Sequence, residues 1–112
     1  MTDELLSIVE TALADSMGPS VVRIATVPIQ ECVARLREEN SFMVLVLADA
    51  DLPSLDRAML LAAIGPLAVA RAPAGRIGAL DIAPSASHEA IAAAAQFLVG
   101  ATSTTGQILR IA

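Results

Sequence analysis

The 112-residue sequence contains no tyrosine, no lysine and no tryptophan, and its only phenylalanines are Phe42 and Phe97. Aromatic side chains that could stack on nucleic-acid bases are therefore scarce. The seven arginines are scattered along the chain, form no basic cluster, and leave a formal net charge of −5. Because nucleic acids and anionic membrane surfaces attract basic proteins, we expect this chain to bind neither.

Cysteine and histidine are equally scarce, with Cys32 and His88 the only examples. One thiol cannot form a disulfide within the chain, and one thiol with one imidazole cannot complete a zinc site. The acidic first residues lack the basic start and apolar run of a secretion signal. The longest apolar run, residues 58–64, is far shorter than the about 20 residues of a membrane helix. We therefore expect a cytoplasmic protein.

Small aliphatic residues dominate what is present, and hydrophobic residues make up 55% of the chain. The length fits a single domain, residues 1–112, whose core packs through small aliphatic contacts. The surplus of apolar residues suggests burial against a second chain. Arginine without lysine, together with abundant alanine, indicates a GC-rich coding sequence, as in many bacteria, and carries no functional meaning.

Hydrophobic periodicity predicts helices and strands in strict alternation. The expected helices are residues 2–16, 28–39, 54–72 and 87–98, and the expected strands are 21–27, 42–48, 76–83 and 105–111. Alternation of this kind predicts parallel strands joined by crossover helices. The predicted fold is a small Rossmann-like α/β domain of two or three layers with about four parallel strands.

Several residues refine this prediction. Arg23 and Thr26 make the first strand typical of a sheet edge, whereas the apolar second strand suits burial on both faces. Ser54 and Ser87 are expected to cap the third and fourth helices. Gly65-Pro66 lies inside the third helix and predicts a kink or a break there.

Candidate binding residues follow the second strand. Asp49 and Asp51 come directly after it, and Asp56 lies just beyond. Ligands of open α/β sheets favour the carboxyl ends of strands, so a metal or a hydroxyl-bearing ligand is one interpretation. Turn formation and helix capping, for which aspartate is favoured, is the simpler one.

Three other polar groups allow both a functional and a structural interpretation. His88-Glu89 could act as an acid/base pair, or Glu89 could complement the positive end of the last helix. Asp81 lies inside a covered strand and needs a partner, which Arg110 on the next strand would supply as a structural ion pair. The hydroxyl-rich segment 102–105 could hold a phosphate or be a solvated loop.

The third helix and the segments after it contain a succession of sequence motifs that is typical of a known protein family. Arg57-Ala-Met-Leu-Leu-Ala is followed by Pro66-Leu-Ala-Val-Ala-Arg-Ala-Pro-Ala-Gly75, a strand ending Ile82-Ala-Pro84, and Thr105-Gly-Gln-Ile-Leu109. This succession resembles the short-chain dehydrogenase/reductase family. The resemblance is specific from about residue 57 to 111 and weaker over residues 6–49. The resemblance implies that the chain corresponds to the C-terminal half of such an enzyme, without the family's first three strands.

The departures from the family pattern concern its active site. In register, the family's catalytic lysine falls on Arg57 and its tyrosine on Pro53. Proline has no proton to donate, and arginine stays protonated and cannot replace the lysine. The sequence has no Gly-x-x-x-Gly-x-Gly turn for a cofactor pyrophosphate, and the substrate loop is reduced to about residues 85–87. The resemblance therefore implies a relative with neither catalysis nor a cofactor.

The leading functional hypothesis is a non-catalytic assembly domain. Half of a doubly wound sheet should have an exposed edge and an uncovered face, which a symmetric dimer or a complex with a full-length reductase would cover. The last helix and last strand of the family commonly meet their symmetry mates. The interface candidates are Ile91, Ala94, Phe97, Leu98, Gln107, Leu109 and Ile111.

The alternative hypothesis is a small-molecule or nucleotide-binding protein, or a weak enzyme. Its site would be formed by the loops at the carboxyl ends of the strands, with Asp49, Asp51, Arg57 and Ser85 as lining residues.

Overall fold

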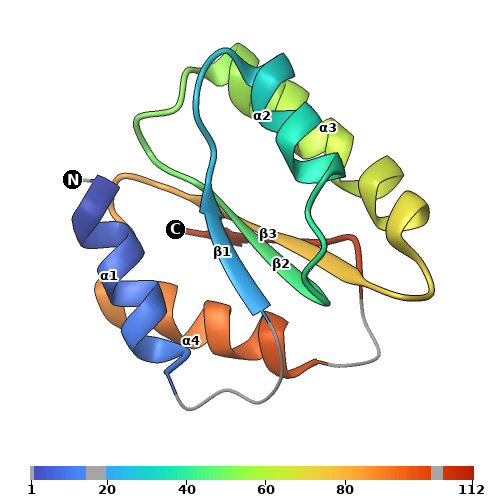
Figure 1. The fold of residues 1–112 in the computed structure, drawn as a ribbon. Coiled ribbons are helices and arrows are strands. Elements are labelled where there is room, and N and C mark those ends of the chain that lie inside the picture. The colour runs from blue at the N-terminus through green and yellow to red at the C-terminus, as the bar shows by residue number, and fades with distance from the viewer. Residues whose placement is uncertain (1, 15–19, 102–104) are drawn as a thin grey trace.

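The computed structural model describes residues 2–14, 20–101 and 105–112, which form a parallel four-stranded sheet with helices on both faces (Figure 1). The elements are α1 (Thr2–Ala12), β1 (Ser20–Ile24), α2 (Ile29–Arg37), β2 (Met43–Ala48), α3 (Ser54–Arg71), β3 (Arg76–Ile82), α4 (His88–Gly100) and β4 (Gln107–Ile111). The strand order is β1-β2-β3-β4, so each strand pairs with the next along the chain. The predicted α/β class is confirmed, in its three-layer form.

Two helices cover each face of the sheet, α2 and α3 on one side and α1 and α4 on the other (Figure 1). β2 and β3 are buried along their whole length, while β1 and β4 form the partly exposed edges. The prediction of β1 as an edge strand is confirmed. The expectation of an uncovered face is wrong, because α1 lies beside α4 and completes the second layer.

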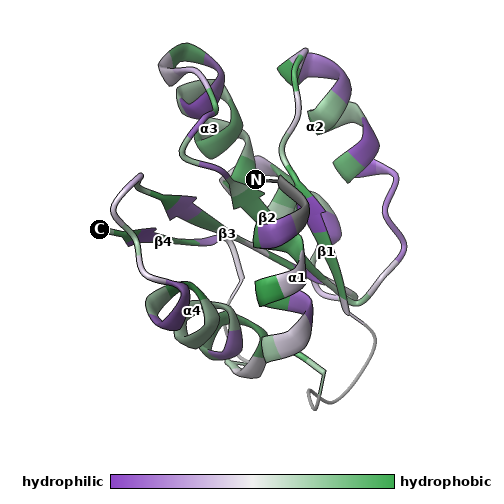
Figure 2. Cartoon of the chain, turned by 90° about the vertical axis from the view of Figure 1, so that its left-hand side faces the viewer, coloured by the Kyte–Doolittle hydropathy of each residue, from purple (hydrophilic) through white to green (hydrophobic). Residues whose placement is uncertain are grey.

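The core consists of two apolar clusters separated by the sheet. Successive residues of β2 point to opposite clusters, Val44 and Val46 toward α2 and α3, and Leu45 and Leu47 toward α1 and α4. This double burial explains why β2 is apolar without interruption. Figure 2 shows the apolar strands between the helix layers and hydrophilic residues along α2. No helix in the described ranges is long and apolar enough to span a membrane.

The third crossover has the opposite hand to the first two. α2 connects β1 to β2 and α3 connects β2 to β3, so both steps run in the same direction across the sheet. Both helices lie on the same face. α4 makes the next step in the same direction but lies on the opposite face. Most crossovers of this type share one hand. The change of hand brings α4 against α1, the helix farthest from it in the sequence (Figure 1).

Helix termini differ in part from the predictions. α1 ends at Ala12, and its expected end near Ser16 lies outside the described residues. Ser87 is confirmed as the N-cap of α4, since its Oγ accepts a hydrogen bond from the Ala90 N–H at 3.1 Å. The expectation for Ser54 is wrong, because Pro53 occupies the cap position and Ser54 is already the first helical residue.

α3 is not split at Pro66. Proline lacks the N–H that would donate to the carbonyl of Ala62. Ala62 and Pro66 both lie on the exposed side of the helix, where water can take the place of the missing donor. The helix therefore continues for 18 residues.

Two arginines secure the loops at the amino ends of the strands. Arg71 donates to the carbonyl oxygens of Glu39, at 2.8 Å, and Ser41. Arg76 is buried and donates to the carbonyl oxygens of Val99, at 2.9 Å, and Ala101, at 2.8 Å, at the end of α4. These side chains satisfy carbonyl groups that a helix end or a loop otherwise leaves unpaired.

Candidate functional site

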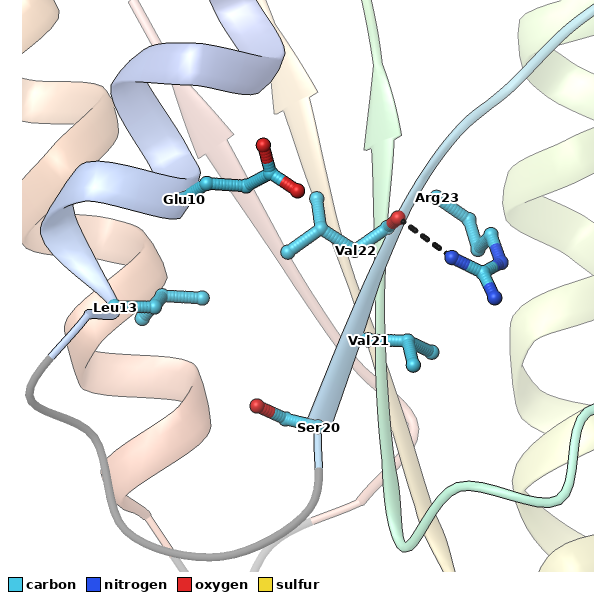
Figure 3. Close-up of a pocket in the computed structure, with 6 residues that line it drawn as sticks. All are labelled: Glu10, Leu13, Ser20, Val21, Val22 and Arg23. Carbon is cyan, nitrogen blue, oxygen red and sulfur yellow. Dashed lines mark hydrogen bonds between the residues drawn. The ribbon is translucent and has the colours of Figure 1, made fainter.

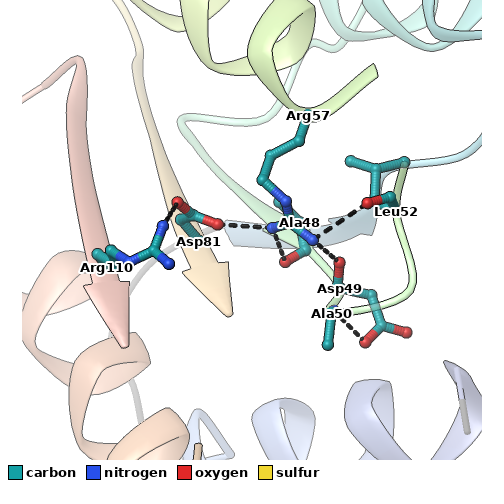
Figure 4. A network of polar contacts seen from close by, with 7 residues as sticks. All are labelled: Ala48, Asp49, Ala50, Leu52, Arg57, Asp81 and Arg110. Atoms are coloured by element: carbon teal, nitrogen blue, oxygen red, sulfur yellow. Dashed lines mark hydrogen bonds and ion pairs between the residues drawn. The ribbon is translucent and has the colours of Figure 1, made fainter. Parts of the chain in front are cut away.

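A charged cluster joins three elements at the carboxyl ends of the strands (Figure 4). Asp81 of β3 lies opposite Arg110 of β4 in the strand register, and Oδ2 of Asp81 accepts from Nη1 of Arg110 at 3.0 Å. Its other oxygen, Oδ1, accepts from Nη1 of Arg57 in the first turn of α3, at 2.6 Å. The predicted Asp81–Arg110 ion pair is confirmed, and Arg57 is a second partner that the sequence did not reveal.

The guanidinium of Arg57 donates its hydrogen bonds to acceptors within the protein. Nη1 also donates to the carbonyl of Ala48 at 3.2 Å, and Nη2 donates to the carbonyls of Asp49 and Leu52 (Figure 4). Its side chain is only 18% exposed. Charge-assisted hydrogen bonds of this kind are strong, so Arg57 fixes the loop after β2 rather than facing a ligand.

The four predicted ligand-loop residues are divided among separate places. Asp49 and Asp51 both line a cavity of about 310 Å³ at the ends of β1 and β2. Arg57 lines another cavity of about 220 Å³, together with Arg110. Ser85 is exposed in the loop after β3 and lines neither cavity. The structure therefore brings the two aspartates together but does not combine all four residues in one site.

The polar contacts of Asp49 are those of a turn. Its Oδ1 accepts from the N–H of Ala50 at 2.6 Å, and its carbonyl accepts from the N–H of Leu52 at 3.0 Å. Asp56 is part of the first turn of α3, where a carboxylate complements the helix dipole. Within the described residues, no three side chains of His, Cys, Asp or Glu gather as a metal site requires.

His88 pairs with a different acid from the one beside it in the sequence. Its Nε2 lies 3.1 Å from Oε1 of Glu4 on α1, and the two side chains are 66% and 63% exposed. Glu89 is exposed in the first turn of α4. The contact with Glu4 depends on the packing of α1 against α4, which local spacing could not reveal.

The hydroxyl-rich segment is described only in part, since residues 102–104 lie outside the described residues. Oγ1 of Thr105 accepts from the N–H of Ile77 at 3.1 Å. This contact ties the end of the connection between α4 and β4 to β3, which is a structural role.

A further cavity, of about 280 Å³, lies along the outer edge of β1 (Figure 3). Glu10 of α1 and Leu13, which directly follows that helix, line it on one side. Arg23 donates to the carbonyl of Val22 at 3.2 Å and is paired with Glu39 of the α2–β2 loop. The cavity thus borders an edge strand, and Arg23 is occupied by contacts within the chain.

The predicted interface residues of α4 and β4 fall into two groups. Phe97 is 57% exposed and Gln107 is exposed, while Ala94 and Leu109 are half-buried. The remaining three, Ile91, Leu98 and Ile111, are buried between α4 and the sheet.

The outward side of α3 is an apolar surface that the sequence analysis did not identify. Leu55 is 73% exposed and Val69 is 77% exposed, and Met59 lies between them on the same side. The residues of this helix that face solvent recur at helical spacing and are apolar from Leu55 to Ala70. That absence of charge at the outward positions is a signal the sequence contains.

The layers, the strand order and the polar edge define a Rossmann-like α/β domain. The chain belongs to the short chain dehydrogenase-like protein family, whose family profile matches residues 9–111. No curated protein and no solved structure matches the chain.

The described residues do not fit the dinucleotide cofactor whose pyrophosphate the glycine-rich turn of the family holds. At the carboxyl edge, α2, α3 and α4 follow Pro28, Pro53 and Ser87, whereas close approach of a pyrophosphate to a helix N-terminus requires glycine. Arg57, which the sequence resemblance aligns with the family's lysine, is turned toward Asp81 and the carbonyl of Asp49.

Proposed function

We propose that this chain is a non-catalytic assembly domain that associates with a second copy of itself. The observation that carries the proposal is the exposure of three large apolar side chains, Leu55, Val69 and Phe97, each more than half exposed. Fully burying one such side chain contributes roughly 1.5–3 kcal/mol. Large exposed apolar surfaces of this kind typically mark interaction sites.

The residues at the family's catalytic positions support the non-catalytic part of the proposal. Pro53 has no ionisable group, and the guanidinium of Arg57 stays charged at physiological pH. The contacts of Arg57 with Asp81 and with three carbonyl groups give it a structural role. Neither residue is suited to proton transfer.

A second copy is the simplest partner, because most soluble oligomers are symmetric dimers of one chain. The two candidate surfaces are the outward side of α3 and the exposed part of α4 and β4 around Phe97. A full-length reductase is the other partner to be tested.

Sedimentation velocity of the wild-type protein at micromolar concentration tests self-association, and the expected result is a dimer. The triple variant Leu55→Glu/Val69→Glu/Phe97→Glu places charge on both surfaces and is expected to be monomeric. Ser85→Glu, which changes an exposed loop residue, is the control and should remain a dimer. A monomeric wild-type protein would overturn the proposal, and so would a triple variant that stays dimeric.

A second candidate function is small-molecule binding, favoured by the cavity of about 310 Å³ that Asp49 and Asp51 line. Ligands of open α/β sheets commonly bind at this edge. A thermal-shift screen with nucleotides, acyl thioesters and divalent metals tests it, with Asp51→Asn as the matched variant. Stabilisation of the wild type but not of the variant would support binding there, and no shift with any compound would count against it.

A further inference from the structure

We infer that the open edge of β1 is a docking site for an extended, basic segment of a different polypeptide, which adds to the four-stranded sheet as a further strand. The site includes the cavity of about 280 Å³ between this edge and the end of α1 (Figure 3). The inference goes beyond the proposed self-association and does not depend on it, because the surfaces proposed there lie on α3, α4 and β4.

Every second residue of β1 directs its backbone polar groups away from the sheet. Ala25, which directly follows β1, donates its N–H to the carbonyl of Leu47 on β2 at 2.9 Å. Because backbone groups alternate in direction along a strand, Val22 and Ile24 direct their N–H and carbonyl groups to the open edge. The carbonyl of Val22 is accordingly free to accept from Nη1 of Arg23, at 3.2 Å. A row of such groups is a template for another strand.

The edge of β1 is only weakly protected. The strand contains no proline, which would remove a donor from its edge. Arg23 covers one acceptor, the carbonyl of Val22, and its side chain is 47% exposed. Its Nε and Nη2 donate to Glu39, so a peptide N–H can replace Nη1 at that carbonyl while the ion pair with Glu39 remains.

The cavity beside this edge is negatively charged. Glu10 is exposed in the last turn of α1, and Figure 3 shows its carboxylate pointing toward Val22. Among the described residues Glu10 has no ion-pair partner, and the last turn of α1 contains no basic residue. The negative end of the helix dipole adds to this charge. Arg23, which also lines the cavity, is neutralised by Glu39. A basic side chain on the docked strand would therefore be attracted.

The two faces of this edge favour different side chains on the docked strand. Val22 packs on the face of α1 and α4, where Glu10 lies, and Val21 packs on the face of α2 and α3. Both valines are only half-buried, so each can contact a side chain of an added strand. A segment that alternates basic and apolar residues would place its basic side chains beside Glu10 and its apolar side chains beside Val21.

The same charge disfavours a second copy of this chain at the β1 edge. Two β1 strands paired about a two-fold axis would lie in one continuous sheet, with both α1 helices on the same face. Both Glu10 side chains and the negative ends of both helices would then approach each other. Like charges placed in this way are destabilising, and the net charge of −5 on each copy adds to the repulsion.

Amide hydrogen exchange of the full chain, measured by NMR with and without a probe peptide, tests the site. The probe is the capped peptide Thr-Val-Arg-Val-Arg-Val-Thr, which has arginine on one face and valine on the other. When about 90% of the protein is bound, exchange at the amides of Val22 and Ile24 should slow about ten-fold, because only the free protein exchanges quickly. The amide of Ile108 on β4, the other edge strand, is the internal control and should not change.

The charge preference is tested with a second probe and two variants. A peptide with glutamate in place of both arginines should give no protection. Glu10→Gln should weaken binding of the basic probe about two- to five-fold, as expected for the loss of one exposed ion pair. Glu31→Gln, at an exposed position of α2, is the matched control and should bind like the wild type.

Three results would overturn the inference. The first is unchanged exchange at Val22 and Ile24 at saturating concentrations of the basic probe. The second is equal binding of the basic and acidic probes, or equal binding of the wild type and Glu10→Gln. The third is protection of Val22 that appears without peptide and grows with protein concentration, which would show a second copy at this edge.

Discussion

The carboxylate of Asp81 lies 2.6 Å from the guanidinium of Arg57, although 24 residues separate them in the chain. This ion pair joins the first turn of α3 to the end of β3, and Arg110 extends it to β4. The cluster contains two arginines and one carboxylate and therefore has a net positive charge. It holds α3 against the sheet at the carboxyl ends of β3 and β4.

Removing the shared carboxylate should destabilise the fold more than removing its exposed partner. Asp81→Ala leaves Arg57 without its ion pair in a largely buried place, and we expect a loss of about 2–3 kcal/mol in the free energy of unfolding. Arg110 is 71% exposed, so Arg110→Ala should cost about 0.5 kcal/mol. Urea unfolding of both variants measures the difference, and equal losses would show that the buried pair has no special role.

Replacing Arg76 should loosen the end of α4. Arg76→Met keeps an unbranched apolar side chain but removes the donors to the carbonyls of Val99 and Ala101, and we expect a loss of about 2 kcal/mol. Arg37→Met, at an exposed position, should change stability by less than about 0.5 kcal/mol. Amide hydrogen exchange should show faster exchange at the end of α4 in the Arg76 variant alone. Unchanged exchange there would contradict the capping role.

Replacing a glycine with alanine should change the stability of the fold in opposite directions at two positions. Gly106 has a φ of 74°, and a Cβ there would lie 3.1 Å from the Cβ of Ala68, so Gly106→Ala should destabilise by about 1–2 kcal/mol. Gly100 ends α4 with open space around it, and Gly100→Ala should stabilise by about 0.5 kcal/mol. Thermal unfolding gives both signs, and a stabilising Gly106→Ala would refute the strain argument.

The cap of α4 gives a fourth test. Ser87→Ala removes the acceptor for the N–H of Ala90, and we expect a loss of about 1 kcal/mol. Ser85→Ala, two residues earlier in the exposed loop, should be neutral. Because His88 follows the cap directly, Ser87→Ala should also weaken its contact with Glu4, which the chemical shifts of the imidazole report. Equal stability of the two serine variants would show that the cap contributes nothing.

Most of the fold could be predicted from the sequence, because hydrophobic periodicity reports burial directly. The uninterrupted apolar run of β2 predicted a strand covered on both faces, and the structure confirms it. Asp81 is a clear case, since a carboxylate inside a buried strand requires a cation and the next strand offers Arg110.

The parts that could not be predicted depend on which elements meet in space. The contact between Glu4 and His88 requires α1 to lie against α4, and the coverage of the second face requires the same packing. The role of Arg57 depends on where its long side chain turns, which spacing along α3 does not determine. The sequence pattern of α3 did contain the apolar outward face. The inward side, with Leu60 and Ile64, is apolar as well, so the pattern alone does not show which side faces solvent.

The opposite hand of the third crossover has a consequence for how the chain folds during translation. The face of β2 that points to α2 and α3 can be covered once the chain up to about residue 71 has emerged from the ribosome. The other face, with Leu45 and Leu47, gains α4 only after the chain has been made almost to its last strand. Until then only α1 covers that face of a nascent chain, and the apolar residues that α4 will bury stay accessible to a chaperone.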